Sequence, residues 1–189
     1  VQGRSQTDPI TTIQNGMADI EHHMLHFLDN HDEQRLASPE FAGTPEKGKP
    51  LMVVSATIST SPSMIYFGQE VGEAGNENGG FGTHSRTSIF DYVGVPNHQR
   101  WMNEGKFDGG QLSQSEKDLR DFYKRLLNFT LNSTALMGQY KAFYIDGKNV
   151  EQIMPVTTPK DFDALKGLGL KPQLLSNDGT ADDDSGNMA

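Results

Sequence analysis

The sequence predicts an α/β protein built from parallel βα units. Two short apolar segments, residues 24–28 and 63–67, each run directly into polar residues, and an apolar segment of helical length separates them. A strand without polar alternation is buried on both faces, as in parallel sheets that helices cover. A third apolar pattern, after Leu112, has helical periodicity. We therefore expect parallel strands joined by helices.

The composition excludes several functional classes. The chain has 189 residues, a length typical of one domain, and a formal net charge of −9. Nucleic acid is not an expected partner, because phosphate binding requires clustered cations and the sequence has none. No apolar run approaches the roughly 20 residues of a membrane-spanning helix, so we expect no membrane span. Cys is absent, which excludes disulfides, thiolate nucleophiles and Cys-ligated zinc.

The composition of the chain does not decide the location of the protein. Residues 1–9 are polar and show no signal peptide. The absence of Cys is common in bacterial secreted enzymes but decides no compartment. We expect a secreted or periplasmic location.

The first predicted strand, residues 24–28, is followed at once by the polar run Asp-Asn-His-Asp at residues 29–32. In a barrel of parallel strands the chemistry collects at the carboxyl ends of the strands. Asp32 supplies a carboxylate there. Neutral His31 offers one hydrogen-bond donor and one acceptor. A simple polar turn is the alternative interpretation.

Residues 51–58 are compatible with either a strand or a helix. Several β-branched side chains favour a strand, whereas Pro50 is well placed near the first position of a helix. We prefer a buried helix, because the following segment, residues 63–67, fits a strand better. Gln69 and Glu70 follow that strand and indicate a structural network more than a direct catalytic role.

The later part of the chain contains one clear helix. Ser113 and Glu116 form a capping-box pattern, and apolar residues recur at helical spacing after them. Before it, residues 73–83 are rich in Gly and Asn, which is typical of a long loop. Residues 141–153 suggest a hairpin that turns at residues 146–147. The remaining residues are acidic and are predicted to be partly disordered.

Two segments resemble the α-amylase family of glycoside hydrolases. The run Phe-Leu-Asp-Asn-His-Asp at residues 27–32 resembles the motif that ends the seventh barrel strand of that family. Residues 62–70 resemble its eighth strand, typically Pro-x-Ile-Tyr-x-Gly-x-Glu. The resemblance covers residues 20–140, and it implies the C-terminal portion of a (β/α)8 TIM barrel, its last two βα units, incomplete on its own. Residues 1–140 would form these units, and residues 141–189 a post-barrel segment or the start of a β-sandwich domain.

The resemblance also implies a function. The chain would be part of a retaining α-glucan hydrolase, a glycosidase that cleaves α-1,4-glucosidic bonds of starch or maltooligosaccharides. Asp32 would be the catalytic carboxylate that stabilises the transition state. The expected substrate-binding residues are His31 at the cleavage subsite, Asn30, which supports the backbone of the motif, and Arg86 near the neighbouring sugar.

The sequence departs from the family in what it lacks. Retaining hydrolysis requires a nucleophile and a general acid about 5–5.5 Å apart, and the family's motifs for both are missing. We therefore expect the remainder of the barrel to come from the same or another chain, and the 189-residue chain alone to be inactive. The alternatives are a non-catalytic carbohydrate-binding or scaffold fragment and, among enzymes, a transglycosylase or sucrose isomerase.

No cofactor is implied for this segment. The family's usual Ca²⁺ ligands lie largely in segments that are missing, so Ca²⁺ concerns only the complete enzyme. His22 and His26 are four residues apart, but the His-Glu-x-x-His order of zinc hydrolases is absent.

Overall fold

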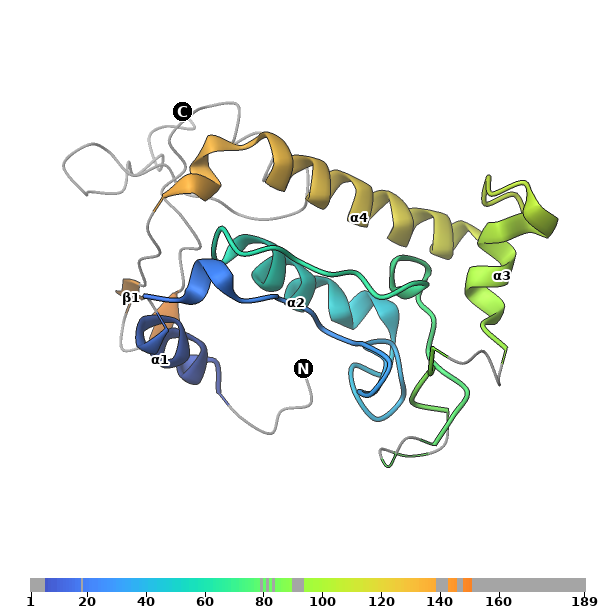
Figure 1. The fold of residues 1–189 in the computed structure, drawn as a ribbon, viewed down its shortest axis with the longest axis horizontal. Helices are drawn as coiled ribbons and strands as arrows, with labels where there is room; N and C mark the ends of the chain where they lie inside the picture. The colour runs from blue at the N-terminus through green and yellow to red at the C-terminus, as the bar shows by residue number, and fades with distance from the viewer. Residues whose placement is uncertain are drawn as a thin grey trace, which may run out of the picture.

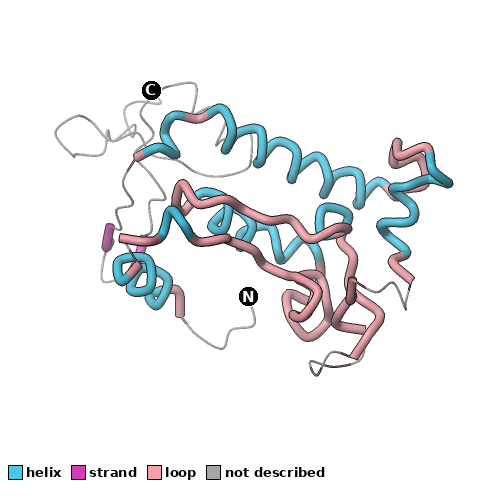
Figure 2. The backbone as a smooth tube through the Cα atoms, in the orientation of Figure 1, coloured by secondary structure: helices cyan, strands magenta, loops and turns pink. Residues whose placement is uncertain are grey.

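The computed structural model describes residues 6–17, 19–78, 80, 82, 84–89, 94–138, 143–145 and 148–150. Helices α2 and α4 lie side by side along the long axis of the molecule, with α1 near one end and α3 near the other (Figure 1). Figure 2 shows that long loops connect these helices. In chain order the elements are α1 (Asp8–Gly16), η1 (Glu21–His23), α2 (Pro45–Thr57), η2 (Gln69–Val71), α3 (Pro96–Met102), η3 (Asn103–Gly105), α4 (Gln114–Asn132), η4 (Thr134–Met137), β1 (Phe143–Ile145) and β2 (Lys148–Val150).

The hydrophobic core lies between α2 and α4. Helix α4 has apolar residues three and four positions apart, so they form one stripe on the helix surface. Leu126 is fully buried and Leu119 is 2% exposed. Two loop residues, Leu28 and Ile65, pack against this core from outside the helices. The buried core residues are Met52, Val53, Ala56, Leu119, Phe122, Tyr123 and Leu126.

Helix α4 confirms the prediction made from its capping box. The Ser113 side chain accepts a hydrogen bond from the backbone N–H of Glu116 at 3.3 Å. The Glu116 carboxylate in turn accepts one from the backbone N–H of Ser113 at 2.7 Å. These two bonds satisfy donors that the first turn of a helix otherwise leaves unpaired.

Helix α2 confirms the choice of helix over strand but begins earlier than expected. Thr44 caps it and Pro45 starts it, so Pro50 lies inside the helix rather than at its first position. The close approach of the Leu36 side chain explains Gly48. A Cβ atom there would lie 2.7 Å from the Cδ2 atom of Leu36, which is closer than packing allows.

The predicted barrel portion is wrong. Among the described residues the named strands are β1 and β2, each three residues long, and they pair only with each other. The expected strands at residues 24–28 and 63–67 share a single parallel bridge, His26 to Ser63. The apolar run predicted burial on both faces, but Leu25 is 50% and Phe27 is 42% exposed. The described part of the chain is therefore mainly helix and loop, not successive βα units.

The predicted hairpin is confirmed: β1 and β2 are antiparallel, with Ile145 opposite Lys148. Its expected turn at residues 146–147, the domain boundary expected after residue 140 and the segment expected to be disordered lie outside the described residues. Among the helices that the structure describes, none is long and apolar enough to cross a membrane.

Candidate functional site

The acid loop, defined as residues 29–36, places an exposed carboxylate beside an exposed imidazole. The Nε2 atom of His31 lies 3.3 Å from the Oδ2 atom of Asp32, and these side chains are 47% and 74% exposed. The Oδ1 atom of Asn30 accepts hydrogen bonds from the backbone N–H groups of Asp32 and Glu33, both at 2.8 Å. This Asx-type turn fixes the backbone that bears Asp32 while its side chain stays accessible.

A buried ion pair lies at the two ends of this turn. The side chains of Asp29 and Arg35 are both 0% exposed, and Nη1 of Arg35 lies 3.7 Å from Oδ2 of Asp29. The same Oδ2 atom accepts a hydrogen bond from the backbone N–H of Leu36 at 3.0 Å. The Asp29 side chain therefore bonds across the loop and closes it.

Arg35 joins the acid loop to two other segments. Its Nη2 donates to the carbonyl of Phe67 at 2.8 Å, and its Nε donates to Oγ1 of Thr87 at 3.1 Å. Its backbone N–H donates to the carbonyl of Ser85 at 2.6 Å. The guanidinium also lies 4.4 Å from the ring centroid of Tyr66, within the range of a cation–π interaction. Arg35 thus forms a clamp on residues 66–67 and 85–87.

The electrostatics of the pair follow from its burial. Desolvation raises the pKa of Asp29 to about 6, although Arg35 and the N–H of Leu36 act in the opposite direction. Desolvation likewise lowers the pKa of Arg35, against the attraction of Asp29. Oδ1 of Asp29 and Nη1 of Arg35 are buried and have no hydrogen-bond partner among the described residues. Burying two charges with incomplete hydrogen bonding is costly, so stability alone does not explain the pair.

Arg86 lies on a segment next to the acid loop, as part of a short antiparallel contact with Glu77. Its Nη2 lies 3.0 Å from Oε2 of Glu77, and its side chain is 29% exposed. The pKa of Glu77 lies below its ordinary value, mainly because its carboxylate accepts a hydrogen bond from the backbone N–H of Ser88. The hydrogen bond from the guanidinium of Arg86 lowers this pKa further. Gly75 allows this contact, because a Cβ atom there would lie 2.7 Å from the backbone N of Arg86. The charge of Arg86 is therefore already partnered within the protein.

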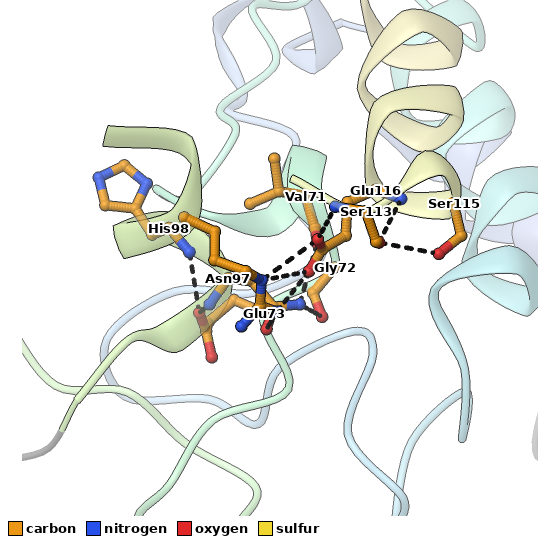
Figure 3. A network of polar contacts seen from close by, with 9 residues as sticks. Val71, Gly72, Glu73, Asn97, His98, Ser113, Ser115 and Glu116 are labelled. Carbon is orange, nitrogen blue, oxygen red and sulfur yellow. Dashed lines mark hydrogen bonds and ion pairs between the residues drawn. The ribbon is translucent and has the colours of Figure 1, made fainter. Parts of the chain in front are cut away.

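A polar network joins α3 to η2 (Figure 3). The buried carboxylate of Glu73 accepts hydrogen bonds at Oε2 from the backbone N–H groups of Asn97, at 2.9 Å, and His98, at 3.3 Å. The Nδ2 atom of Asn97 donates to the carbonyls of Val71 and Gly72, both at 3.0 Å. A negative charge at the start of a helix is favourable, so Glu73 stabilises α3 in this position.

The same network reaches α4 through Arg100. Its Nη2 donates to Oδ1 of Asn97 at 2.7 Å, and its Nε donates to the carboxylate of Glu116 at 3.1 Å. Glu116 also belongs to the capping box of α4, which Figure 3 shows with Ser113. Arg100 therefore has a structural partner on each side.

An aromatic row extends from the clamp across α3 to the residues that follow η3. It consists of Phe67, His98, Trp101 and Phe107, whose successive ring centroids are 5.3, 5.6 and 5.8 Å apart. The two end rings are the most exposed: Phe67 is 36% and Phe107 is 56% exposed, whereas His98 and Trp101 are half-buried. Phe107 has a φ of 56°, which is unusual for a residue other than glycine.

Gln69 forms a buried contact with the core rather than with the acid loop. Its Nε2 donates to the hydroxyl of Tyr123 at 3.1 Å, and it lies 3.6 Å from the sulfur of Met52. These contacts agree with the structural role expected for this position. Burial is the main cause that raises the pKa of Tyr123, and the hydrogen bond from Gln69 opposes this shift.

The structure adds residues that the sequence did not single out. Asp32, His31 and Asn30, which the sequence singled out, lie on one turn. The buried partners Arg35, Thr87 and Asp29 were missed as a functional group. The one signal in the sequence was Asp29, a charged residue directly after an apolar run. No sequence pattern indicates which arginine will be buried, so Arg35 could not be singled out.

No metal centre is visible among the described residues, where no group of three or more His, Cys, Asp or Glu side chains could hold a metal ion. The rings of His22 and His23 are 3.9 Å apart, and both residues are exposed.

The site and the fold define a mainly helical protein with an exposed Asp–His pair on a clamped loop. Comparison with family models, curated proteins and solved structures finds no match for this chain.

Proposed function

We propose that the acid loop presents Asp32 to an α-glucan, and that the chain is part of a retaining α-glucan hydrolase. The observation that supports this proposal is the exposed Asp32–His31 pair on a turn fixed by Asn30. In such a reaction the sugar ring flattens and gains positive charge, and a fixed carboxylate stabilises that state more than the substrate. His31 hydrogen-bonds a sugar hydroxyl.

Asp32 supplies one of the carboxylates that the reaction needs. A nucleophile and a general acid must lie about 5–5.5 Å apart on either side of the bond that is cleaved. The motifs that carry these two groups in the α-amylase family, which the sequence resembles, are absent from this sequence. The 189-residue chain alone is therefore expected to show no turnover of maltoheptaose, and detectable hydrolysis by the pure chain would contradict this part of the proposal.

The test compares two ligands on the full chain by calorimetric titration. Maltoheptaose is neutral, whereas an acarviosine-containing pseudo-oligosaccharide has a flattened ring and a positively charged nitrogen. Asp32→Asn is expected to weaken the charged ligand by about tenfold more than maltoheptaose, because only the charged ligand resembles the transition state. Glu33→Gln, which changes an exposed carboxylate on the same turn, is the matched control and should change neither affinity.

Two outcomes oppose the proposed role of Asp32. If Glu33→Gln lowers the affinity for the charged ligand as much as Asp32→Asn does, the ligand responds to the total negative charge of the turn and not to Asp32 in particular. If Asp32→Asn leaves both affinities unchanged while binding stays saturable, the chain binds saccharides without a catalytic carboxylate.

The aromatic row supports that second candidate, a carbohydrate-binding function without catalysis. Aromatic rings contact the apolar faces of sugars, and the exposed rings of Phe67 and Phe107 lie at the two ends of the row. In this case Phe107→Ala lowers the affinity for maltoheptaose, whereas Leu131→Ala does not. Leu131 is a suitable control because it is apolar, 83% exposed and located on α4, away from the row.

A further inference from the structure

The Asp29–Arg35 pair has the features of a device that responds to protons. Both side chains are fully buried, and they link the two ends of the acid loop. If the loop opened, water would reach both groups, and Asp29 would regain the ordinary pKa of a carboxyl group. The closed and open loops therefore differ in how tightly Asp29 holds a proton.

The direction of the effect follows from that difference. Burial raises the pKa of Asp29 from 3.8 to about 6 in the closed loop. The closed loop thus binds a proton about 10²-fold more tightly than an open loop with an ordinary carboxyl. Acid favours closure, and a rise in pH through 6 favours opening.

Several other groups act on the pair and were considered. Glu70 and Glu73, on and after η2, add negative charge near it, and Tyr66 stacks on the guanidinium. Tyr123 on α4 contributes a neutral hydroxyl, since burial raises its pKa further above neutrality. Of the buried pair, Asp29 is the group whose pKa burial raises to about 6.

We propose that the buried Asp29–Arg35 pair couples proton binding to closure of the acid loop, and so controls how firmly Asp32 is positioned. The consequence for Asp32 rests on the proposed function, whereas the coupling itself does not. Asp29 and Arg35 are positioning residues in this scheme, because they touch the turn and not the saccharide. No substrate is needed to test the coupling, so its failure can be distinguished from failure of the proposed function.

The backbone N–H of Leu36 reports the closed state directly, because it donates to Oδ2 of Asp29. Its hydrogen exchange is measured by NMR on the full chain between pH 4 and pH 7.5 and expressed as a protection factor. The protection factor is expected to fall by up to about 10²-fold over this range. Asp29→Asn keeps the acceptor but cannot ionise, so its Leu36 protection factor should not change with pH.

The control amide is that of Ile58, which donates to the carbonyl of Val54 at the end of α2. It should keep a constant protection factor in both proteins. A parallel fall at Ile58 would show global unfolding rather than loop opening and would overturn the proposal. The proposal is also overturned if Leu36 shows no pH dependence, or the same pH dependence in Asp29→Asn.

A second measurement needs no substitution and therefore does not depend on whether Asp29→Asn folds. The ¹³C resonance of the Asp29 carboxyl carbon in the unaltered chain should titrate with a midpoint near 6, matching the Leu36 transition. A midpoint near the ordinary value of 3.8 would overturn the proposal.

Discussion

The core between α2 and α4 and the clamp around Arg35 are held together by opposite means. The core excludes water from apolar side chains such as Leu126, which is fully buried. The clamp buries two charges, Asp29 and Arg35, and ties loop backbone to them through hydrogen bonds. Apolar burial is non-directional and tolerates repacking, whereas the clamp depends on both partners being present. Apolar stripes on helices suffice for the core, whereas the loop that bears Asp32 is held by directional bonds to a buried charge pair.

The largest expected effect comes from breaking the clamp. Arg35→Ala leaves the buried carboxylate of Asp29 without a counter-ion, which typically costs about 3–5 kcal/mol. Urea denaturation at pH 7.5 measures this loss. The loss should be smaller at pH 5, where Asp29 takes up a proton in place of its partner. Arg86→Ala is the control, because Arg86 is 29% exposed and its pair with Glu77 should contribute about 0–1 kcal/mol. Equal losses in the two variants would mean that burial does not distinguish the clamp.

The core should show a loss of similar size but no dependence on pH. Leu126→Ala removes a fully buried side chain and leaves a cavity, at a cost of about 2–5 kcal/mol. Because no charge is involved, the loss measured by urea denaturation should be the same at pH 5 and pH 7.5. Leu131→Ala, on the same helix but 83% exposed, should change the free energy of unfolding by less than about 0.5 kcal/mol. A pH-dependent loss in Leu126→Ala would contradict the separation between the two regions.

The pH dependence of stability sharpens the comparison further. The pKa of Asp29 is raised to about 6 from 3.8, so the folded state holds this proton more tightly than the unfolded state. The resulting stabilisation is fully present below about pH 3.8 and is lost as pH rises through 6. Relative to Asp29→Asn, the free energy of unfolding should fall by about 2–3 kcal/mol between pH 4 and pH 7. Urea denaturation of both proteins across this range checks it, and a difference that stays constant or rises with pH would reverse the sign.

The two regions also differ in how far the sequence predicts them. The helical core was predictable because its signals are local. The capping box of Ser113 and Glu116 and the spacing of Leu119, Phe122 and Leu126 all lie within α4. Residues 24–28 show the limit of such signals. Their apolar run predicted a buried strand, but burial requires neighbouring strands, and the described structure supplies a single bridge between His26 and Ser63.

The clamp was not predictable, because its contacts join positions far apart in the chain. Arg35 bonds to Phe67 and Thr87, which follow it by 32 and 52 residues. The exposed pair of His31 and Asp32 was found from its short polar motif alone, since both residues belong to one turn. Local motifs therefore indicated the exposed part of the site, and only the structure revealed its buried support.

The smallest expected effect tests the local signal at the start of α4. Ser113→Ala removes the side-chain acceptor for the N–H of Glu116 and should lower the free energy of unfolding by about 1 kcal/mol. Ser113→Asn keeps a capping side chain and should stay within a few tenths of a kcal/mol of the unaltered protein. Thermal or urea unfolding distinguishes the two variants. Because Glu116 also bonds to Arg100, a loss well above 1 kcal/mol in Ser113→Ala would show that the cap and the α3 network form one cooperative unit. Equal behaviour of the Ala and Asn variants would show instead that packing of α4 on α2 fixes the start of the helix without the cap.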